Sequence, residues 1–185
     1  MAKKALKEQI ALVAYELFRK NGYDKTTVEA IASATGMSTR TYFRYFPTKE
    51  DVLMEQTYAF RERFIEGFTE KLDSEDIWEA MKNLLTEYAL NCAGTQEEEI
   101  QAFIRATPAL VTRQFVIFEA LLSEATDLYM SQHRNDLSWH TVNAFIRSAF
   151  SCLQAIQGRQ PEKISYKAFN DLMMEMRPVL LTQPR

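Results

Sequence analysis

Hydrophobic positions recur at helical spacing along almost the whole chain. In the first segment, Ile10, Val13, Ala14, Leu17 and Phe18 fall at i, i+3, i+4, i+7 and i+8, which is one face of a helix. Each later segment is bounded by capping residues, glycine or proline, which mark where a helix begins or ends. The pattern predicts nine helices and no strand, with three short helices first and longer ones after. They begin near residues 3, 27, 38, 48, 75, 95, 107, 138 and 165, the fourth running to about residue 72 and the ninth to about residue 181.

The second and third predicted helices form a helix-turn-helix pattern. Val28–Ala34 is followed by a three-residue turn that contains Gly36, and then by Ser38–Tyr45. Glycine allows the positive φ that such a turn needs. Thr26 and Glu29 have the spacing of a capping box at the start of the second helix. The third helix carries hydroxyls, two arginines and aromatic rings within eight residues, a mixture that suits base edges and phosphates.

Charge divides the chain in a way that agrees with this pattern. The net charge is −3, but residues 1–50 hold nine Lys/Arg and five Asp/Glu, a net of +4. The remaining 135 residues hold 13 basic and 20 acidic side chains, a net of −7. This asymmetry favours a basic contact surface on an acidic body, although a charge run is usually a solvated face. We therefore expect an all-α, two-domain chain, with a DNA-binding domain over 1–47 and a helical regulatory and dimerisation domain over 48–185.

Several classes of protein are disfavoured. No apolar run approaches the ~20 residues that span a bilayer, and no signal peptide is recognisable, so we expect a cytoplasmic protein without a membrane partner. Cys92 and Cys152 are flanked by apolar residues and are expected to be buried thiols. His133 and His140 lack metal-ligand spacing, and no nucleophile elbow or phosphate loop is present. We expect no enzyme activity, no cofactor and no metal.

A longer motif surrounds the helix-turn-helix. Its parts are Val13-Ala14…Leu17-Phe18, Gly22-Tyr23…Thr26-Thr27-Val28, Ile31-Ala32…Thr35-Gly36-Met37-Ser38 and Thr41-Tyr42-Phe43-Arg44-Tyr45-Phe46-Pro47-Thr48-Lys49-Glu50…Leu53. This stretch resembles the N-terminal signature of the TetR-type (TetR/AcrR) transcriptional regulators, including its loop spacings. It departs from the signature at Thr35, Met37 and Phe43, where the family has Ala, Val and Tyr. The family's Tyr offers its hydroxyl to a phosphate, which Phe43 cannot do, so Tyr42 or Tyr45 is an alternative donor.

The resemblance implies a set of DNA contacts. Thr39 and Arg40 would read bases, and Thr41 and Arg44 would lie at the edge of the groove. The start of the second helix and Lys49 would hold phosphates. For Tyr42 and Tyr45, packing and DNA contact remain alternatives. The complete expected set is Thr26, Thr27, Ser38, Thr39, Arg40, Thr41, Tyr42, Arg44, Tyr45 and Lys49.

The resemblance also implies a ligand pocket between the central helices and a homodimer joined by the last two helices. Pocket residues would be Phe60, Phe64, Phe68, Trp78, Met81, Tyr88, Phe103, Phe115 and Phe118, with Arg105, Arg113 or Glu119 as polar anchors. Interface residues would be Phe145, Ala149, Phe150, Leu153, Phe169, Leu172, Met173 and Met176. Core packing within one chain is the alternative for both sets. The segment from Arg105 to Gln114, with Arg44–Pro47, resembles a subgroup with acyl-CoA-like effectors.

The predicted function is a ligand-responsive repressor on double-stranded DNA, released from a palindromic operator by an apolar small molecule. Two alternatives remain at this point. The chain could bind DNA without any ligand, or it could be a helical interaction protein whose motif has lost DNA binding. Arg40, Thr41 and Lys49, retained within the motif, speak against the last alternative.

Overall fold

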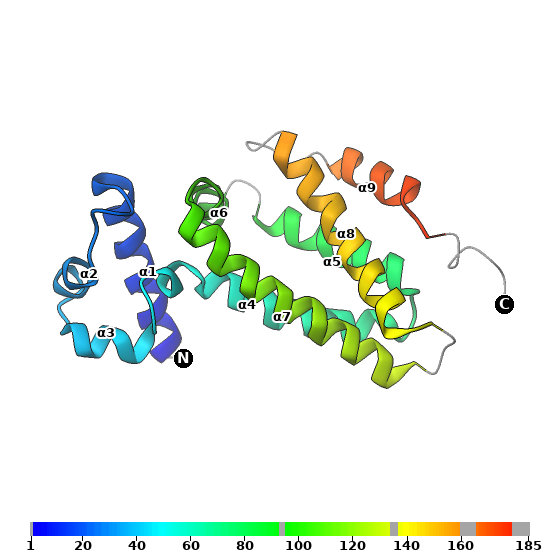
Figure 1. The fold of residues 1–185 in the computed structure, drawn as a ribbon, viewed down its shortest axis with the longest axis horizontal. Coiled ribbons are helices and arrows are strands. Elements are labelled where there is room, and N and C mark those ends of the chain that lie inside the picture. The colour runs from blue at the N-terminus through cyan, green and yellow to red at the C-terminus, as the bar shows by residue number, and fades with distance from the viewer. Residues whose placement is uncertain (1, 93–94, 134–136, 160–165, 179–185) are drawn as a thin grey trace. The chain divides into compact units, whose positions relative to one another are not determined.

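The computed structural model describes residues 2–92, 95–133, 137–159 and 166–178. Helices and turns make up these residues, and none of them lies in a β-strand (Figure 1). The predicted all-α class is therefore confirmed. The elements are α1 (Ala2–Asn21), α2 (Val28–Ala34), α3 (Thr39–Tyr45), the 3₁₀ helix η1 (Glu50–Leu53), α4 (Glu55–Leu72), α5 (Ile77–Cys92), α6 (Gln96–Ala106), α7 (Pro108–Gln132), α8 (Trp139–Arg159) and α9 (Tyr166–Glu175).

The start of α2 differs by one residue from the predicted capping box. Thr27 is the N-cap, and its hydroxyl accepts from the N–H of Ala30 at 3.2 Å. Thr26 is buried instead, and its hydroxyl donates to the carbonyl oxygens of Gly22 (2.9 Å) and Leu17 (3.2 Å). Since these carbonyls belong to the end of α1 and the loop after it, Thr26 fixes the path of the chain between α1 and α2.

Two predicted helices have different limits in the structure. The fourth is not continuous from residue 48, because η1 and α4 are separated at Met54. Thr48 and Asp51 form reciprocal bonds at the start of η1, the Thr48 hydroxyl accepting from the Asp51 N–H at 3.3 Å and the Asp51 carboxylate accepting from the Thr48 N–H at 3.1 Å. The ninth helix ends at Glu175, shortly before Pro178, whose ring disfavours a helical residue in front of it. The predicted end near residue 181 lies outside the described residues.

The described residues pack into two compact units. The first contains residues of Met1–Ala59 and Gln96–Ile117, and the second contains residues of Phe60–Thr95 and Phe118–Arg185. The predicted DNA-binding segment, 1–47, falls within the first unit, while a functional boundary after residue 47 stays a prediction. Each unit has its own hydrophobic core.

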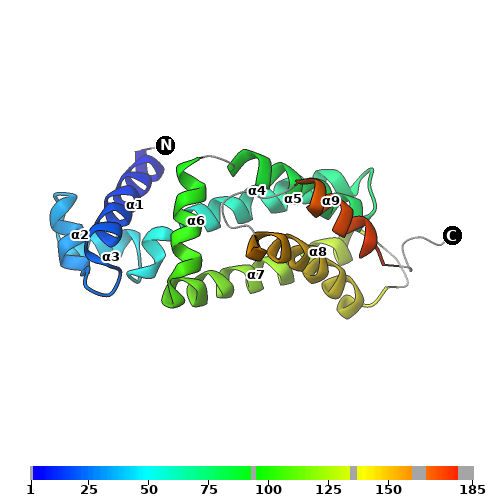
Figure 2. The ribbon, with the colours of Figure 1, turned by 90° about the horizontal axis from the view of Figure 1, so that it is seen from above.

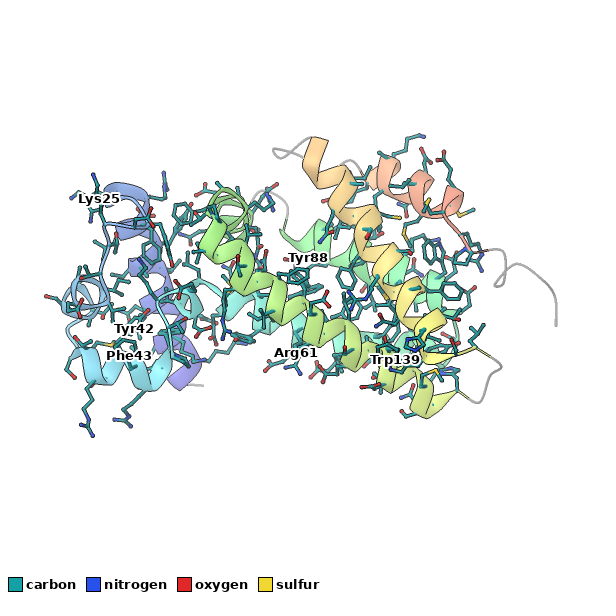
Figure 3. All side chains as sticks on the ribbon, viewed as in Figure 1. Lys25, Tyr42, Phe43, Arg61, Tyr88 and Trp139 are labelled. Atoms are coloured by element: carbon teal, nitrogen blue, oxygen red, sulfur yellow. The ribbon has the colours of Figure 1, made fainter. Side chains whose placement is uncertain are left out.

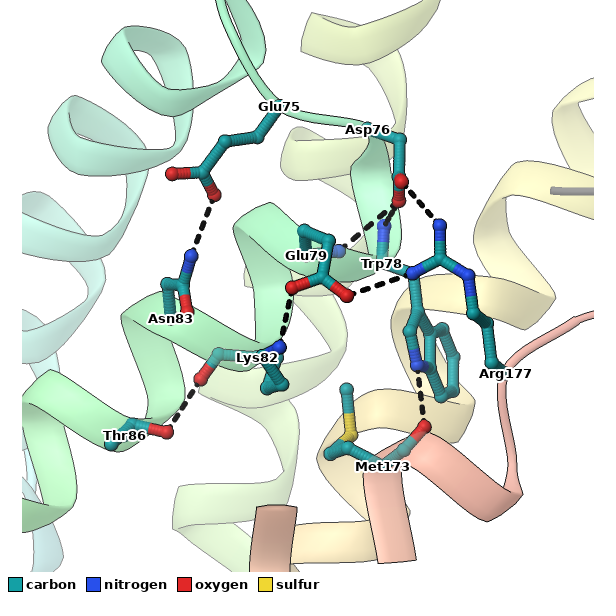
Figure 4. A network of polar contacts seen from close by, with 9 residues as sticks. All are labelled: Glu75, Asp76, Trp78, Glu79, Lys82, Asn83, Thr86, Met173 and Arg177. Carbon is teal, nitrogen blue, oxygen red and sulfur yellow. Dashed lines mark hydrogen bonds and ion pairs between the residues drawn. The ribbon is translucent and has the colours of Figure 1, made fainter. Parts of the chain in front are cut away.

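Helices α5, α8 and α9 pack against one another in the second unit (Figure 2). The contact between α5 and α9 is fixed by polar groups (Figure 4). The Asp76 carboxylate caps α5 by accepting from the N–H groups of Trp78 and Glu79 at 2.9 and 3.2 Å. Arg177, beyond the end of α9, forms ion pairs with Asp76 and Glu79, and the Trp78 indole donates to the Met173 carbonyl at 2.7 Å.

None of the described helices is both long enough and apolar enough to cross a membrane.

Candidate nucleic-acid interface

The α2–α3 unit is held by its turn and by a shared core. The N–H of Met37 donates to the Ala32 carbonyl at 2.9 Å, and Gly36 between the helices has φ of +70°. Ser38 caps α3, its hydroxyl accepting from the Thr41 N–H at 3.1 Å. Ala32 is buried, and its small side chain lets the helices approach closely. The predicted helix-turn-helix is confirmed.

One face of α3 points to solvent. Arg40, Phe43 and Arg44, at i, i+3 and i+4, are exposed, whereas Tyr42 on the opposite face is fully buried. Within the described part of the chain, neither Arg40 nor Arg44 has a hydrogen-bond or ion-pair partner. Two unpaired guanidinium groups on one exposed helix face can meet phosphates or guanine edges without first breaking an internal contact.

Tyr42 cannot make the predicted DNA contact. Its side chain is fully buried, and its ring packs against those of Phe46 (5.4 Å between centroids) and Phe43 (5.7 Å; Figure 3). Its hydroxyl has no hydrogen-bond partner among the described residues, and burial raises its pKa. Packing is therefore the correct alternative for Tyr42. Tyr45 is half-buried, so packing and DNA contact both remain alternatives for it.

Lys49 has a structural role that the sequence did not reveal. Its ammonium donates to the carbonyls of Tyr23 (3.0 Å) and Thr26 (3.2 Å) and lies 4.0 Å from the centre of the Tyr23 ring. The Tyr23 hydroxyl donates to the Glu50 carboxylate; burial and this bond raise the pKa of Tyr23. Two of the three ammonium protons of Lys49 are thus used inside the protein, to hold the loop before α2.

Several of the other predicted DNA contacts use their side chains within the protein. The Thr27 and Ser38 side chains are used as helix caps, and the Thr41 hydroxyl lies 2.9 Å from that of Ser38. Thr39 is half-buried beside Arg40. Thr26 was expected to hold a phosphate through its backbone N–H, but this N–H donates to the Tyr23 carbonyl at 3.3 Å and the residue is buried. Lys25 is exposed in the loop before α2 (Figure 3). It was not predicted as a DNA contact, and the only sequence signal for it was its position in the loop before the second predicted helix.

Seven of the nine predicted pocket residues gather in the second unit. Phe60, Phe64, Phe68, Trp78 and Met81 are buried, and Tyr88 and Phe118 are half-buried. Two residues do not belong to this group. Phe103 packs in the first unit, stacked 6.2 Å from the Phe18 ring, and Phe115 is 61% exposed. Phe103 was assigned to the wrong core because an aromatic residue on a helix does not reveal which core it enters. Phe115 enters neither core.

Two of the three predicted polar anchors already have partners. The Arg113 guanidinium donates to the buried Asp51 carboxylate at 2.7 Å. Glu119 forms a bidentate ion pair with Arg147, whose two terminal guanidinium nitrogens donate to its carboxylate oxygens at 2.7 and 2.8 Å. This hydrogen-bonded guanidinium lowers the pKa of Glu119. Arg105 is exposed. The prediction that Arg113 or Glu119 anchors a ligand stays a prediction, and both side chains also hold the protein together through these ion pairs.

Most of the predicted dimer residues belong to the core of a single chain. Leu172 is half-buried, and Met176, beyond the end of α9, is 52% exposed. The six others are covered mainly by their own chain, which favours the alternative of core packing within one chain. These buried residues are Phe145, Ala149, Phe150, Leu153, Phe169 and Met173.

Comparisons with known proteins agree with the geometry of the N-terminal segment. Residues 10–55 match the family model described as bacterial regulatory proteins, tetR family. Over this N-terminal segment the chain is therefore similar to the TetR family. It is 37% identical over 75 residues to the HTH-type transcriptional regulator TcmR of Streptomyces glaucescens, a match that covers 40% of this chain. This chain spans a third of the length of that relative (33%).

Solved structures of TetR-type regulators share the fold over nearly the whole chain. FadR of Thermus thermophilus, a TetR-family repressor in complex with lauroyl-CoA, is 24% identical, with 94% of this chain and 95% of that chain covered and a TM-score of 0.59. FadR of Bacillus halodurans is 19% identical, with the same coverages and TM-score. FadR of Bacillus subtilis, in complex with stearoyl-CoA, is 18% identical, with coverages of 90% and 95% and a TM-score of 0.52.

Proposed function

We propose that this protein regulates transcription by placing α3 in the major groove of a specific double-stranded DNA site. The observation that carries the proposal is the solvent face of α3, where Arg40 and Arg44 have no internal partner among the described residues. A helix-turn-helix docks its second helix in the groove, and unpaired arginines there can reach guanine O6 and N7 or a phosphate. The match of residues 10–55 to a family of bacterial regulatory proteins supports the same function.

The proposed regulator acts as a homodimer on a roughly palindromic operator. Two recognition helices must meet successive major grooves, ~34–36 Å apart, which a two-fold dimer achieves. Because most of the predicted interface residues are buried, the proposed surface is the exposed side of α8 together with α9. Small exposed residues on α8, Ala144, Ser151 and Ala155, would allow close helix contact, and Met174 of α9 is 60% exposed.

The proposed regulator is a repressor that an apolar, acyl-CoA-like effector releases from DNA. Support comes from the aromatic cluster of the second unit. The centroid of the Phe60 ring lies 4.2 Å from that of Tyr88 and 6.0 Å from that of Phe118. The FadR structures with lauroyl-CoA and stearoyl-CoA have the same fold. Such apolar surface suits a fatty acyl chain, provided that the side chains rearrange to admit it.

Helix α4 offers a route by which an effector could act on DNA binding. It follows α3 and η1 along the chain, and the same helix contributes Glu55–Ala59 to the first unit and Phe60–Leu72 to the second. A ligand against Phe60, Phe64 or Phe68 would tilt this helix and change the spacing of the recognition helices. Only a ligand that prefers one arrangement can shift the equilibrium, and a coupling of ~1–3 kcal/mol would change operator affinity about 5–150-fold.

The test begins with selection of DNA from a random double-stranded pool by the full chain. Fluorescence anisotropy then measures affinity for the selected site across a salt titration. We expect Arg40→Ala to lose ~1–3 kcal/mol at one base position and to relax specificity there. Arg63→Ala, an exposed arginine on α4, is the matched control and should leave affinity unchanged. Selection of no defined sequence would contradict the proposed function.

The effector is tested separately on the selected operator. Lauroyl-CoA should lower the operator affinity, whereas coenzyme A alone should not, because it lacks the acyl chain. If lauroyl-CoA binds and the operator affinity stays the same, the chain is a DNA-binding protein without this ligand response, which is the second candidate function.

A further inference from the structure

Phe43 is an apolar residue in an unusual place. It lies on α3 between Arg40 and Arg44 on the solvent face, and 48% of its surface is exposed. The described part of α1–α3 exposes one other large apolar side chain, Leu12 of α1, which is less exposed at 39%. The neighbouring Tyr42 ring supports Phe43 edge-on, with centroids 5.7 Å apart and planes at 87°. One side of the Phe43 ring is therefore held by the protein, and the other is free to meet a partner.

The chemistry of the major groove limits what that partner can be. Base edges in the groove present hydrogen-bond donors and acceptors, with one apolar group, the C5-methyl of thymine. A phenyl ring cannot form hydrogen bonds with phosphates, N7, O6 or amino groups, so it gains most by covering a methyl group. The flanking arginines do not compete for this group, because guanidinium seeks acceptors.

We infer that Phe43 is a specificity-determining residue that covers the C5-methyl group of a thymine in each half-site of the operator. This inference rests on the proposed function, since it requires α3 in the major groove. It assigns to Phe43 a base contact through its apolar ring, in place of a phosphate contact through a hydroxyl. The operator then contains one thymine per half-site that the arginines do not select.

The test replaces each thymine of the selected operator by deoxyuridine, which removes only the methyl group. One buried methyl contributes ~0.8 kcal/mol, which corresponds to about a fourfold loss of affinity per half-site and about sixteenfold when both half-sites are changed. Phe43→Ala should weaken binding to the thymine operator and lose this difference between thymine and uridine. Phe43→Leu, which keeps an apolar side chain, should retain part of it. Circular dichroism checks that both variants stay folded.

Two results would overturn the inference. The first is wild-type affinity that is unchanged by deoxyuridine at every position. The second is a uridine penalty of the same size in wild type and in Phe43→Ala, since the methyl would then contact another residue. In either case Arg40→Ala still reports on the proposed function: if it relaxes base preference while Phe43 has no effect, the chain reads DNA and only the role of Phe43 is wrong. A pool free of methylated cytosine ensures that thymine is the source of the methyl group.

Discussion

The ion pair between Arg113 of α7 and Asp51 of η1 should carry a large share of the local stability of the first unit. Asp51 is 3% exposed, and its carboxylate accepts from the Arg113 Nε at 2.7 Å and from the Thr48 hydroxyl at 3.0 Å. Arg113→Ala leaves this buried carboxylate without a counter-charge. Removing one partner of a buried pair costs ~3–5 kcal/mol, and a hydrogen bond to a charged group is worth ~1.5–3 kcal/mol. Because the Arg113 side chain is 33% exposed, water can partly replace it, and we expect a loss of about 2 kcal/mol.

The assay must report on the correct unit. Trp78 and Trp139 both belong to the second unit, so tryptophan fluorescence would follow the wrong part of the molecule. Native-state hydrogen exchange of the α1–α3 amides measures the opening free energy of the first unit directly. A cycle of Arg113→Ala, Asp51→Asn and the double variant then isolates the pair, with an expected coupling of ~1–2 kcal/mol.

Arg61→Ala is the matched control for this prediction. Arg61 pairs with Glu124 at 2.6 Å in the second unit, but the two side chains are 38% and 40% exposed. Exposed pairs typically contribute ~0.2–1 kcal/mol, so this change should have a small effect even in its own unit. If Arg113→Ala stays within ~0.5 kcal/mol of wild type, or if the cycle is additive within that range, the pair does not stabilise the first unit as argued.

Three further predictions concern local features. Gly36→Ala should lower the stability of the first unit by ~1–2 kcal/mol in the same exchange experiment. The reason is that φ of +70° strains an alanine, although the site has space for its side chain. Gly36→Asn should lower the stability less, because asparagine adopts this conformation more readily. Ser38→Ala should cost ~1 kcal/mol by removing the bond from the Thr41 N–H, and normal protection of α3 in this variant would contradict the cap assignment. In a Cys92→Ser chain, Cys152 should react slowly with a thiol reagent at pH 8 and rapidly in urea, because burial raises its pKa and blocks access; a fast native reaction would contradict this.

Much of the fold could be predicted from the sequence because its determinants are local. Caps, glycines and apolar spacing located the helices and the turn at Gly36 within a few residues. The break at Met54 was missed because η1 depends on the reciprocal bonds between Thr48 and Asp51, a pattern that resembles the start of any helix. The cap of α2 was misplaced because Thr26 and Thr27 have the same side chain, and the sequence does not show that the Thr26 hydroxyl donates to the carbonyls of Gly22 and Leu17.

The candidate site was predicted less completely because it depends on which way each side chain points. Tyr42 and Phe43 are adjacent aromatic residues, yet one is fully buried and the other is half exposed. An apolar stripe likewise indicates burial without indicating the partner. Phe145 and Phe169 were assigned to a second copy but pack within their own chain, and Phe103 entered the core of the first unit.

The basic residues of the first segment show why charge alone is a poor measure of a DNA surface. Residues 1–50 have a net charge of +4, but several of their cations are used internally. Lys7 pairs with Glu55 at 2.8 Å, and Lys49 donates to two loop carbonyls. Each of these cations helps to hold the scaffold that presents α3. On α3 itself, the proposed DNA-binding helix, the available charge is that of Arg40 and Arg44, which the described structure leaves unpaired. This placement explains how an acidic chain can present a local basic face, since electrostatic attraction to phosphates is screened within about 8–10 Å at ordinary ionic strength. At that range the arrangement of charge on one helix matters more than the sum over 185 residues.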